Sequence, residues 1–320
     1  MVDRFRVLAL AGGVGGAKLA YGLARSLGDR LTVLVNTGDD FEHLGLHISP
    51  DLDTVMYTLG GIANPETGWG VAGDNWNCLD QIGKLGGPSW FRLGDKDLAT
   101  HVLRTNRLRR GESLTAITND LCRALNITST ILPMTDDTVR TIVHSYTRTL
   151  PFQDYFVRLR CDLPVTRLSF DGAETAKFNE GLSKLAKGQE PICVIICPSN
   201  PYLSIDPIFS LPGLKDWIHD VASAVIAVSP IVGGAAIKGP AAKIMGELGV
   251  VPSALSVARH YRDVAGGFVM DRADAADADE VRSLGMEVVT TQTVMRDLDG
   301  RVTLAHDCLD FAKRLMKERS

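Results

Sequence analysis

The stretch LALAGGVGGAKLAYGLARSL, residues 8–27, decides the fold of this chain. It places a glycine cluster between a short apolar run and a segment with helical character. Glycine lets a backbone approach a ligand closely, and the free N–H groups at the start of a helix attract anions. The stretch therefore predicts a strand, a loop and a helix that bind phosphate through Gly12, Gly13, Gly15, Gly16 and Lys18.

This loop matches neither of the two common phosphate motifs. A P-loop requires a glycine before its lysine and a hydroxyl residue after it, but Ala17 and Leu19 stand at those positions. The dinucleotide motif G-x-G-x-x-G requires a third glycine where Lys18 stands. The second apolar run ends in Asn36-Thr37, where an NAD-binding protein carries an acid. An ordinary NAD-dependent dehydrogenase is therefore a disfavoured alternative.

Strand and helix patterns alternate through the rest of the chain. Apolar, β-branched runs occupy residues 5–11, 31–37, 193–200, 224–230, 267–271 and 287–291. Helical patterns occupy residues 17–27, 173–187, 240–248, 273–284 and 305–317. Near-continuous apolar runs are typical of strands buried on both faces of a parallel sheet. The alternation predicts an α/β, Rossmann-like, doubly wound fold with a mostly parallel sheet.

Two segments break the alternation. Residues 95–126 resemble two helices without a strand, separated by Gly111, with Ser113 as the N-cap of the second. Residues 138–160 alternate with period two, which predicts an antiparallel hairpin added at an edge of the sheet. We expect one nucleotide-binding domain formed by residues 1–92 and 128–320, interrupted by a small all-helical insertion at residues 93–127.

Composition narrows the class of protein. The 320 residues are 45% hydrophobic and 22% charged, with a net charge of −4, so a folded chain without a basic surface for nucleic acid is expected. No secretory signal pattern and no apolar run of about eighteen residues occurs, which predicts a cytoplasmic protein that does not enter membranes. The six cysteines form no CxxC pair and are expected to be buried thiols.

An acidic segment follows the second apolar run. NTGDDFEHLGLHISPDLDTVMYTLGG, residues 36–61, contains Asp39, Asp40, Asp51 and Asp53 at the edge of the sheet where ligands bind. Carboxylates and substrate phosphates are the ligands that magnesium prefers. The segment therefore predicts a magnesium (Mg2+) site. The alternative is that Asp51 or Asp53 only caps the helix that starts near Leu52.

Three further polar segments are candidates for ligand contacts. Residues 90–101, WFRLGDKDLATH, place Arg92 at the start of the proposed insertion. Ser199 and Asn200 follow an apolar run, where amide groups are positioned to contact the edge of a base, although Ser-Asn-Pro is also ordinary turn chemistry. Residues 229–243 carry glycines and Lys238, a second possible anion loop before a helix near Pro240.

Together these segments resemble one known family, the 2-phospho-L-lactate transferases of coenzyme F(420) biosynthesis, or CofD/FbiA family. The resemblance rests on GGVGGAK, VNTGDD, ISPDLDTVMYTLGG, GWG, LGDKDLATH, LPMTDD, PSNP, SLPG, and VSPIVGG with KGPAAK. These motifs stand in family order and span nearly the whole chain.

The resemblance implies a substrate pair and a reaction. The family joins a phospho-acid from a guanosine-diphosphate-linked donor to the ribityl hydroxyl of the deazaflavin Fo, with release of GMP and a requirement for magnesium. Lactate, enolpyruvate and glycerate all stay open as the acid. The implied assembly is a homodimer. The alternative within the same superfamily is a regulatory protein that binds a sugar nucleotide.

The resemblance also implies roles for particular residues. Asp39 and Asp51 are expected to hold the metal and to act in catalysis, and either of them is a possible acceptor of the hydroxyl proton. Asp51 and Arg92 are expected to contact Fo, and Ser199 and Asn200 the guanosine.

Overall fold

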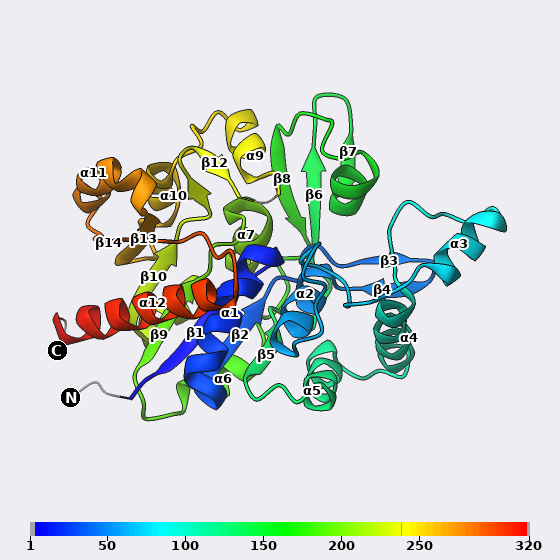
Figure 1. The fold of residues 1–320 in the computed structure, drawn as a ribbon, viewed down its shortest axis with the longest axis horizontal. Coiled ribbons are helices and arrows are strands. Elements are labelled where there is room, and N and C mark those ends of the chain that lie inside the picture. Colours follow the sequence, from blue (N-terminus) through cyan, green and yellow to red (C-terminus); the bar gives the residue numbers. More distant parts are fainter. Residues whose placement is uncertain (1–3, 238, 319–320) are drawn as a thin grey trace.

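The protein is described by a computed structural model that covers residues 4–237 and 239–318, with the side chain of residue 318 left out (Figure 1). Its centre is a seven-stranded sheet in the order β14-β13-β10-β9-β1-β2-β5, with every neighbouring pair parallel. From β1 the chain adds β2 and β5 on one side and then β9, β10, β13 and β14 on the other, so the strand order reverses between β1 and β9, as in Rossmann folds. The predicted fold class is therefore confirmed. The strands are β1 (Arg6–Ala11), β2 (Leu31–Val35), β5 (Thr130–Pro133), β9 (Ile192–Ile196), β10 (Ala222–Val228), β13 (Gly267–Asp271) and β14 (Glu287–Thr291).

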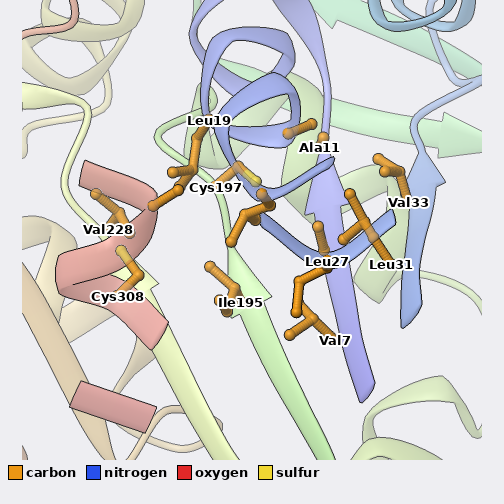
Figure 2. Close-up of a cluster of buried hydrophobic side chains, with 14 of the residues drawn as sticks. Val7, Ala11, Leu19, Leu27, Leu31, Val33, Ile195, Cys197, Val228 and Cys308 are labelled. Atoms are coloured by element: carbon orange, nitrogen blue, oxygen red, sulfur yellow. The ribbon is translucent and has the colours of Figure 1, made fainter. Parts of the chain in front are cut away.

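Two hydrophobic cores cover the two faces of this sheet. Alternate residues of β1 point to opposite faces, so that Val7 and Ala9 join one core while Leu8 and Leu10 join the other. The first core is formed with α1 (Gly13–Leu27), α2 (Pro50–Leu59) and α12 (Leu298–Glu318), and Figure 2 shows part of it. The second core is formed with α6 (Gly181–Ala186), α8 (Leu214–Val221), α10 (Ala254–Tyr261) and α11 (Ala278–Ser283).

Helix boundaries differ from the sequence prediction where tertiary contacts decide them. Helix α1 begins at Gly13, so the glycine cluster forms its first turn rather than a loop before it. Only the end of the predicted helix 173–187 is helical, in α6, because Asn179 and Lys177 are tied to the segment after β5. The predicted helix 273–284 begins as a 3-10 helix, η4 (Arg272–Asp277), and continues as α11.

A long excursion separates β2 from β5. It contains the hairpin of β3 (Phe41–His43) and β4 (Leu46–Ile48), then α2, α3 (Asn77–Lys84), α4 (Asp95–Leu108) and α5 (Leu114–Ala124). The two predicted helices are present as α4 and α5, and Ser113 Oγ accepts a hydrogen bond from the Ala116 N–H as the predicted N-cap. Figure 1 shows β3, β4, α3 and α4 projecting from one end of the molecule. The division into a domain and an insertion stays a prediction.

The period-two segment forms antiparallel strands, but in a sheet of its own. Strands β6 (Arg140–His144), β7 (Thr149–Pro151) and β8 (Arg167–Asp171) pair in the order β7-β6-β8, apart from the central sheet, so the predicted attachment to a sheet edge is wrong. The physical reason is a separate small core that includes Val143, Phe152 and Tyr155 and packs against the chain after β9 through Leu203. The Thr141 N–H also donates to the Gly38 carbonyl, which holds β6 above the end of β2.

Short elements complete the described chain. They are η1 (Gly28–Arg30), the π-helical turns η2 (Asp154–Arg158) and η3 (Pro201–Ile205), α7 (Asp206–Phe209), β11 (Ile231–Val232), β12 (Ala235–Ala236) and α9 (Ala241–Glu247). None of the helices in residues 4–237 and 239–318 is long and apolar enough to cross a membrane.

Candidate functional site

A cavity of about 750 Å³ opens beyond the carboxyl ends of β1 and β9, where the strand order reverses. This is the place where open α/β sheets bind ligands, and the volume suits a small-molecule site of about 300–1,000 Å³. Ten residues are assigned a phosphate, metal, catalytic, Fo or guanosine role from the sequence, and nine of them line it: Gly12, Gly13, Gly15, Lys18, Asp39, Asp51, Arg92, Ser199 and Asn200. Gly16 lies in the first turn of α1 but is not among the lining residues.

The glycine loop is packed tightly against protein groups. The Gly13 N–H donates to Asp51 Oδ1 at 2.7 Å, and the Gly12 N–H donates to Ser199 Oγ at 3.0 Å. A Cβ atom on Gly12 would lie 2.3 Å from Asp51 Oδ2, and one on Gly16 would lie 2.3 Å from Ser199 Oγ. The absence of a side chain at Gly12 and Gly16 therefore allows Asp51 and Ser199 to contact this segment. Because the amides of Gly12 and Gly13 already donate to protein groups, the later amides in the first turn of α1 are the expected phosphate donors.

Lys18 Nζ, on the same helix, donates to the Met295 carbonyl at 3.0 Å while its side chain lines the cavity.

Asp39 and Asp51 form a buried acidic pair in the cavity wall. Burial raises the pKa of Asp51 to about 6, although hydrogen bonds from Asn36 Nδ2 and the Gly13 N–H stabilise its charged form. Burial, and then the charge of Asp51, raise the pKa of Asp39 well above its usual range. Asp39 Oδ1 is buried without a hydrogen-bond partner among the described residues. An unpartnered carboxylate oxygen beside a second carboxylate fits a divalent cation, as predicted for this pair.

Asp40 and Asp53 have different roles. Asp40 Oδ2 accepts hydrogen bonds from Ser49 Oγ at 2.7 Å and pairs with His47 Nε2 at 3.0 Å, facing a separate cavity of about 220 Å³. Asp53 receives both Nη atoms of the buried Arg104 from α4.

Asp53 also belongs to a cluster with Asp97 and His101, whose possible ligand atoms lie within 4.8 Å of one another in the described chain. Arg104 binds both oxygens of Asp53, and the Tyr57 hydroxyl donates to Asp97 Oδ1 at 2.8 Å, so each carboxylate of the cluster already has a partner within the protein. We conclude that it is an ionic network that fixes α2 against α4, rather than a metal centre.

Aromatic side chains form another wall of the cavity. Trp90 and Phe91 pack edge-to-face with each other and with the ring system of Phe41 and His43. Phe152 and Phe156 stack with ring centroids 5.2 Å apart. Arg92 lies over the Trp76 ring at 4.6 Å and lines the cavity. A cavity with a glycine-rich helix start, a carboxylate pair and aromatic walls suits a ligand that combines an anionic group with a planar ring.

The two residues predicted for guanosine have structural partners as well. Ser199 Oγ is engaged by Gly12, and Asn200 Oδ1 accepts the N–H groups of Tyr202 and Leu203 as the cap of η3. Asn200 Nδ2 is buried without a partner in the described part of the chain and is the group left for a ligand. The predicted Lys238 lies outside the described residues.

Sequence reasoning missed the part of the cavity wall that comes from distant segments. These residues are Trp69, Phe152, Gln153, Phe156, Arg160, Thr293 and Met295. Trp69 belongs to the GWG motif, but no local motif marks the others, because only the separate β7-β6-β8 sheet and the loop after β14 bring them to the cavity.

The fold and the site together define an α/β protein of the Rossmann-like class with a cavity at its switch point that is lined by glycines and two buried carboxylates. The family model "2-phospho-L-lactate transferase CofD" matches residues 7–294. The chain belongs to this CofD family of transferases.

Curated relatives match along nearly their whole length. A "Phosphoenolpyruvate transferase" of Thermobifida fusca is 40% identical, with 98% of this chain and 100% of the relative covered. One of Streptomyces coelicolor is 39% identical (97% and 99% covered), and a "2-phospho-L-lactate transferase" of Methanocaldococcus jannaschii is 37% identical (97% and 99%).

A crystal structure of a Bacillus halodurans protein of the UPF0052 family aligns with a TM-score of 0.61. The alignment covers 96% of this chain and 100% of that one at 14% identity, and it supports the fold alone.

Proposed function

We propose that this protein transfers a phospho-acid from a guanosine-diphosphate-linked donor to the ribityl hydroxyl of the deazaflavin Fo, with release of GMP. The observation that carries the proposal is the composition of one cavity. A glycine loop and a buried carboxylate pair face aromatic walls in it, which matches a diphosphate donor meeting a planar, ring-bearing acceptor. The names of the relatives support the same class of transfer.

The reaction requires alignment and neutralisation of charge more than covalent chemistry by the protein. Asp39 and Asp51 would hold Mg2+, which supplies neutralisation of the diphosphate. The hydroxyl oxygen of Fo forms a bond to the phosphorus that bears the acid, the bond from that phosphorus to the GMP oxygen breaks, and the hydroxyl proton leaves. Asp39 or Asp51 would accept that proton, because the carboxylates of both line the cavity.

The remaining predicted residues bind and orient. The first turn of α1 and Lys18 bind phosphate oxygens, and Arg92 with Asp51 contacts Fo. Asn200 contacts the guanosine through its free Nδ2 group. The aromatic residues Trp90 and Phe156 contact the deazaflavin ring and exclude water from it.

Binding of Fo, followed by its fluorescence, tests this proposal. We expect the protein to bind Fo, and Trp90→Ala to weaken binding by about two- to twelvefold from the loss of stacking, because ring stacking contributes about 0.5–1.5 kcal/mol beyond the buried area. Tyr146→Ala is the matched control, since Tyr146 is 83% exposed and lies away from the cavity lining. A protein that ignores Fo but binds a sugar nucleotide would instead be a regulator of the same superfamily.

We also propose that the protein is a cytoplasmic homodimer, as the family resemblance implies. Sedimentation velocity at micromolar concentration would give a mass near twice 34.6 kDa if this is right and near 34.6 kDa if it is wrong.

A further inference from the structure

The segment after η2 has an unusual backbone. Arg160 and Cys161 are consecutive non-glycine residues with left-handed φ angles of 51° and 58°. Among the described residues the other two such positions, Leu44 and Asn126, each occur singly. L-residues adopt this conformation at an energetic cost, so it persists only where the surroundings impose it.

The surroundings of this segment do impose it. The Cys161 N–H donates to the Tyr155 carbonyl at 2.9 Å, and Tyr155 is fully buried in the small core beside the β7-β6-β8 sheet. Farther along, Lys243 Nζ of α9 donates to the Leu163 carbonyl at 3.2 Å, and Glu247 accepts the Val165 N–H at 3.0 Å. Figure 1 shows α9 beside this sheet. The chain on both sides of Arg160 is therefore anchored.

The anchored segment places an unpaired cation at the cavity. Arg160 lines the cavity with Phe156 and Val157, and its guanidinium makes no hydrogen bond or ion pair with any residue the structure describes. The other two described lysine or arginine side chains of the lining are already engaged. Lys18 donates to the Met295 carbonyl, and Arg92 lies over Trp76.

The same segment also contacts the backbone of Asp39. Gln153, at the other end of this wall, donates from Nε2 to the Asp39 carbonyl at 3.1 Å. Arg160 and Gln153 line the same cavity as Asp39 and Asp51, the pair beside which the reacting phosphorus is expected. A second anionic group on the substrate would meet the negative charge of Asp39 and Asp51 there unless a cation offset it.

Lactate, enolpyruvate and glycerate differ in oxidation and hydroxylation, but each carries one carboxylate. In the lactate and enolpyruvate donors it is attached to the carbon that bears the phosphorylated oxygen, and in a 3-phosphoglycerate donor it is one carbon farther away. A guanidinium binds a carboxylate through two parallel N–H···O bonds. We propose that Arg160 binds the carboxylate of the transferred phospho-acid and makes the site specific for donors that carry it. This inference rests on the proposed function and adds a specificity-determining residue to it.

Calorimetry with two donors tests the inference. The first is lactyl-diphospho-guanosine, and the second is ethyl-diphospho-guanosine, which differs only in lacking the carboxylate. A charge-assisted pair contributes about 1.5–3 kcal/mol, so the wild-type protein should bind the carboxylated donor about 10- to 150-fold more tightly. Arg160→Gln should remove that preference and leave the affinity for the ethyl compound unchanged. Arg160→Lys should retain part of the preference.

Arg158→Gln is the matched control. Arg158 is 62% exposed, pairs with Asp154 and does not line the cavity, so its replacement should keep the full preference. A full preference in Arg160→Gln would overturn the inference, and so would an equal loss of affinity for both donors, since Arg160 would then act on the shared diphosphate or on folding. Failure of the proposed function looks different: the wild-type protein itself would then bind neither guanosine-linked donor.

Discussion

Replacing Asp51 by asparagine should remove function and yet stabilise the metal-free protein above pH 7. Asp51 is buried, and its pKa is raised from 3.8 to about 6, mainly by burial. A carboxyl whose pKa is higher in the folded state than in the unfolded state opposes folding once it ionises. The difference of about two pKa units corresponds to a cost of about 3 kcal/mol at pH 7 and above, at 1.36 kcal/mol per unit.

Asp51→Asn removes this cost, but part of the stability gained is offset by the loss of a hydrogen bond. Asp51 accepts from both the Gly13 N–H and Asn36 Nδ2, whereas an asparagine would turn its own NH2 group toward one of these donors. An unmatched buried donor costs about 1–2 kcal/mol, so the net gain above pH 7 should be about 1–2 kcal/mol. Below about pH 4 both forms are neutral, the gain disappears, and the variant should be the less stable protein.

Urea denaturation of both proteins in EDTA, from pH 4 to pH 8, measures this directly. The free energy of unfolding of the variant relative to wild type should rise between pH 4 and pH 6 and change sign. A difference that does not vary with pH, or that falls as pH rises, would refute the reasoning.

Asp53→Asn supplies the contrast within the same helix. Asp53 pairs with the buried Arg104, so its replacement should destabilise the protein by about 3–5 kcal/mol at pH 7.

Three smaller changes test other parts of the account. Gly22→Ala should lower the free energy of unfolding by about 1–3 kcal/mol, because the new Cβ would lie 2.0 Å from the Arg301 carbonyl oxygen of α12. Gly246→Ala is the control: open space surrounds that position, so the change should be neutral or slightly stabilising. Burial opposes ionisation of Asp271, but hydrogen bonds from Ala273 and Thr293 outweigh this effect and lower the pKa of Asp271. The stability that its charged form contributes above about pH 4 should therefore be lost as pH falls. Asp271→Asn should make the melting temperature fall less steeply with acid. Ser113→Ala should cost about 1 kcal/mol in chemical denaturation, because it removes the N-cap of α5.

The sequence is informative about this fold where a signal is local. The buried strands of the central sheet are predictable because their apolar runs are nearly continuous, and Gly111 with Ser113 marks the break between α4 and α5. The sequence does not show that residues 138–160 build a separate sheet. The alternation of polar and apolar residues in β6 would be the same in the central sheet and in a separate one. Strand β5 escaped prediction because TILP is too short to give a pattern.

The residues of the candidate site likewise divide into those that a local sequence signal predicts and those that it does not. Glycines and aspartates next to β1 and β2 are predictable, because the carboxyl ends of neighbouring parallel strands meet at one edge. The different roles of Asp51 and Asp53 are not predictable, because they depend on which side of α2 meets Arg104 of α4. Phe156 and Arg160 reach the cavity only through the packing of Tyr155, which has no signature in the local sequence.

The central claim is that this cavity joins a phospho-acid to a deazaflavin. Mass spectrometry of reactions that contain Fo, magnesium and the guanosine-diphosphate-linked form of lactate, enolpyruvate or glycerate tests it most directly. We expect a product with the mass of Fo plus one phospho-acid minus one water, formed together with an equal amount of GMP, from at least one donor. Fo recovered unchanged with all three donors would contradict it.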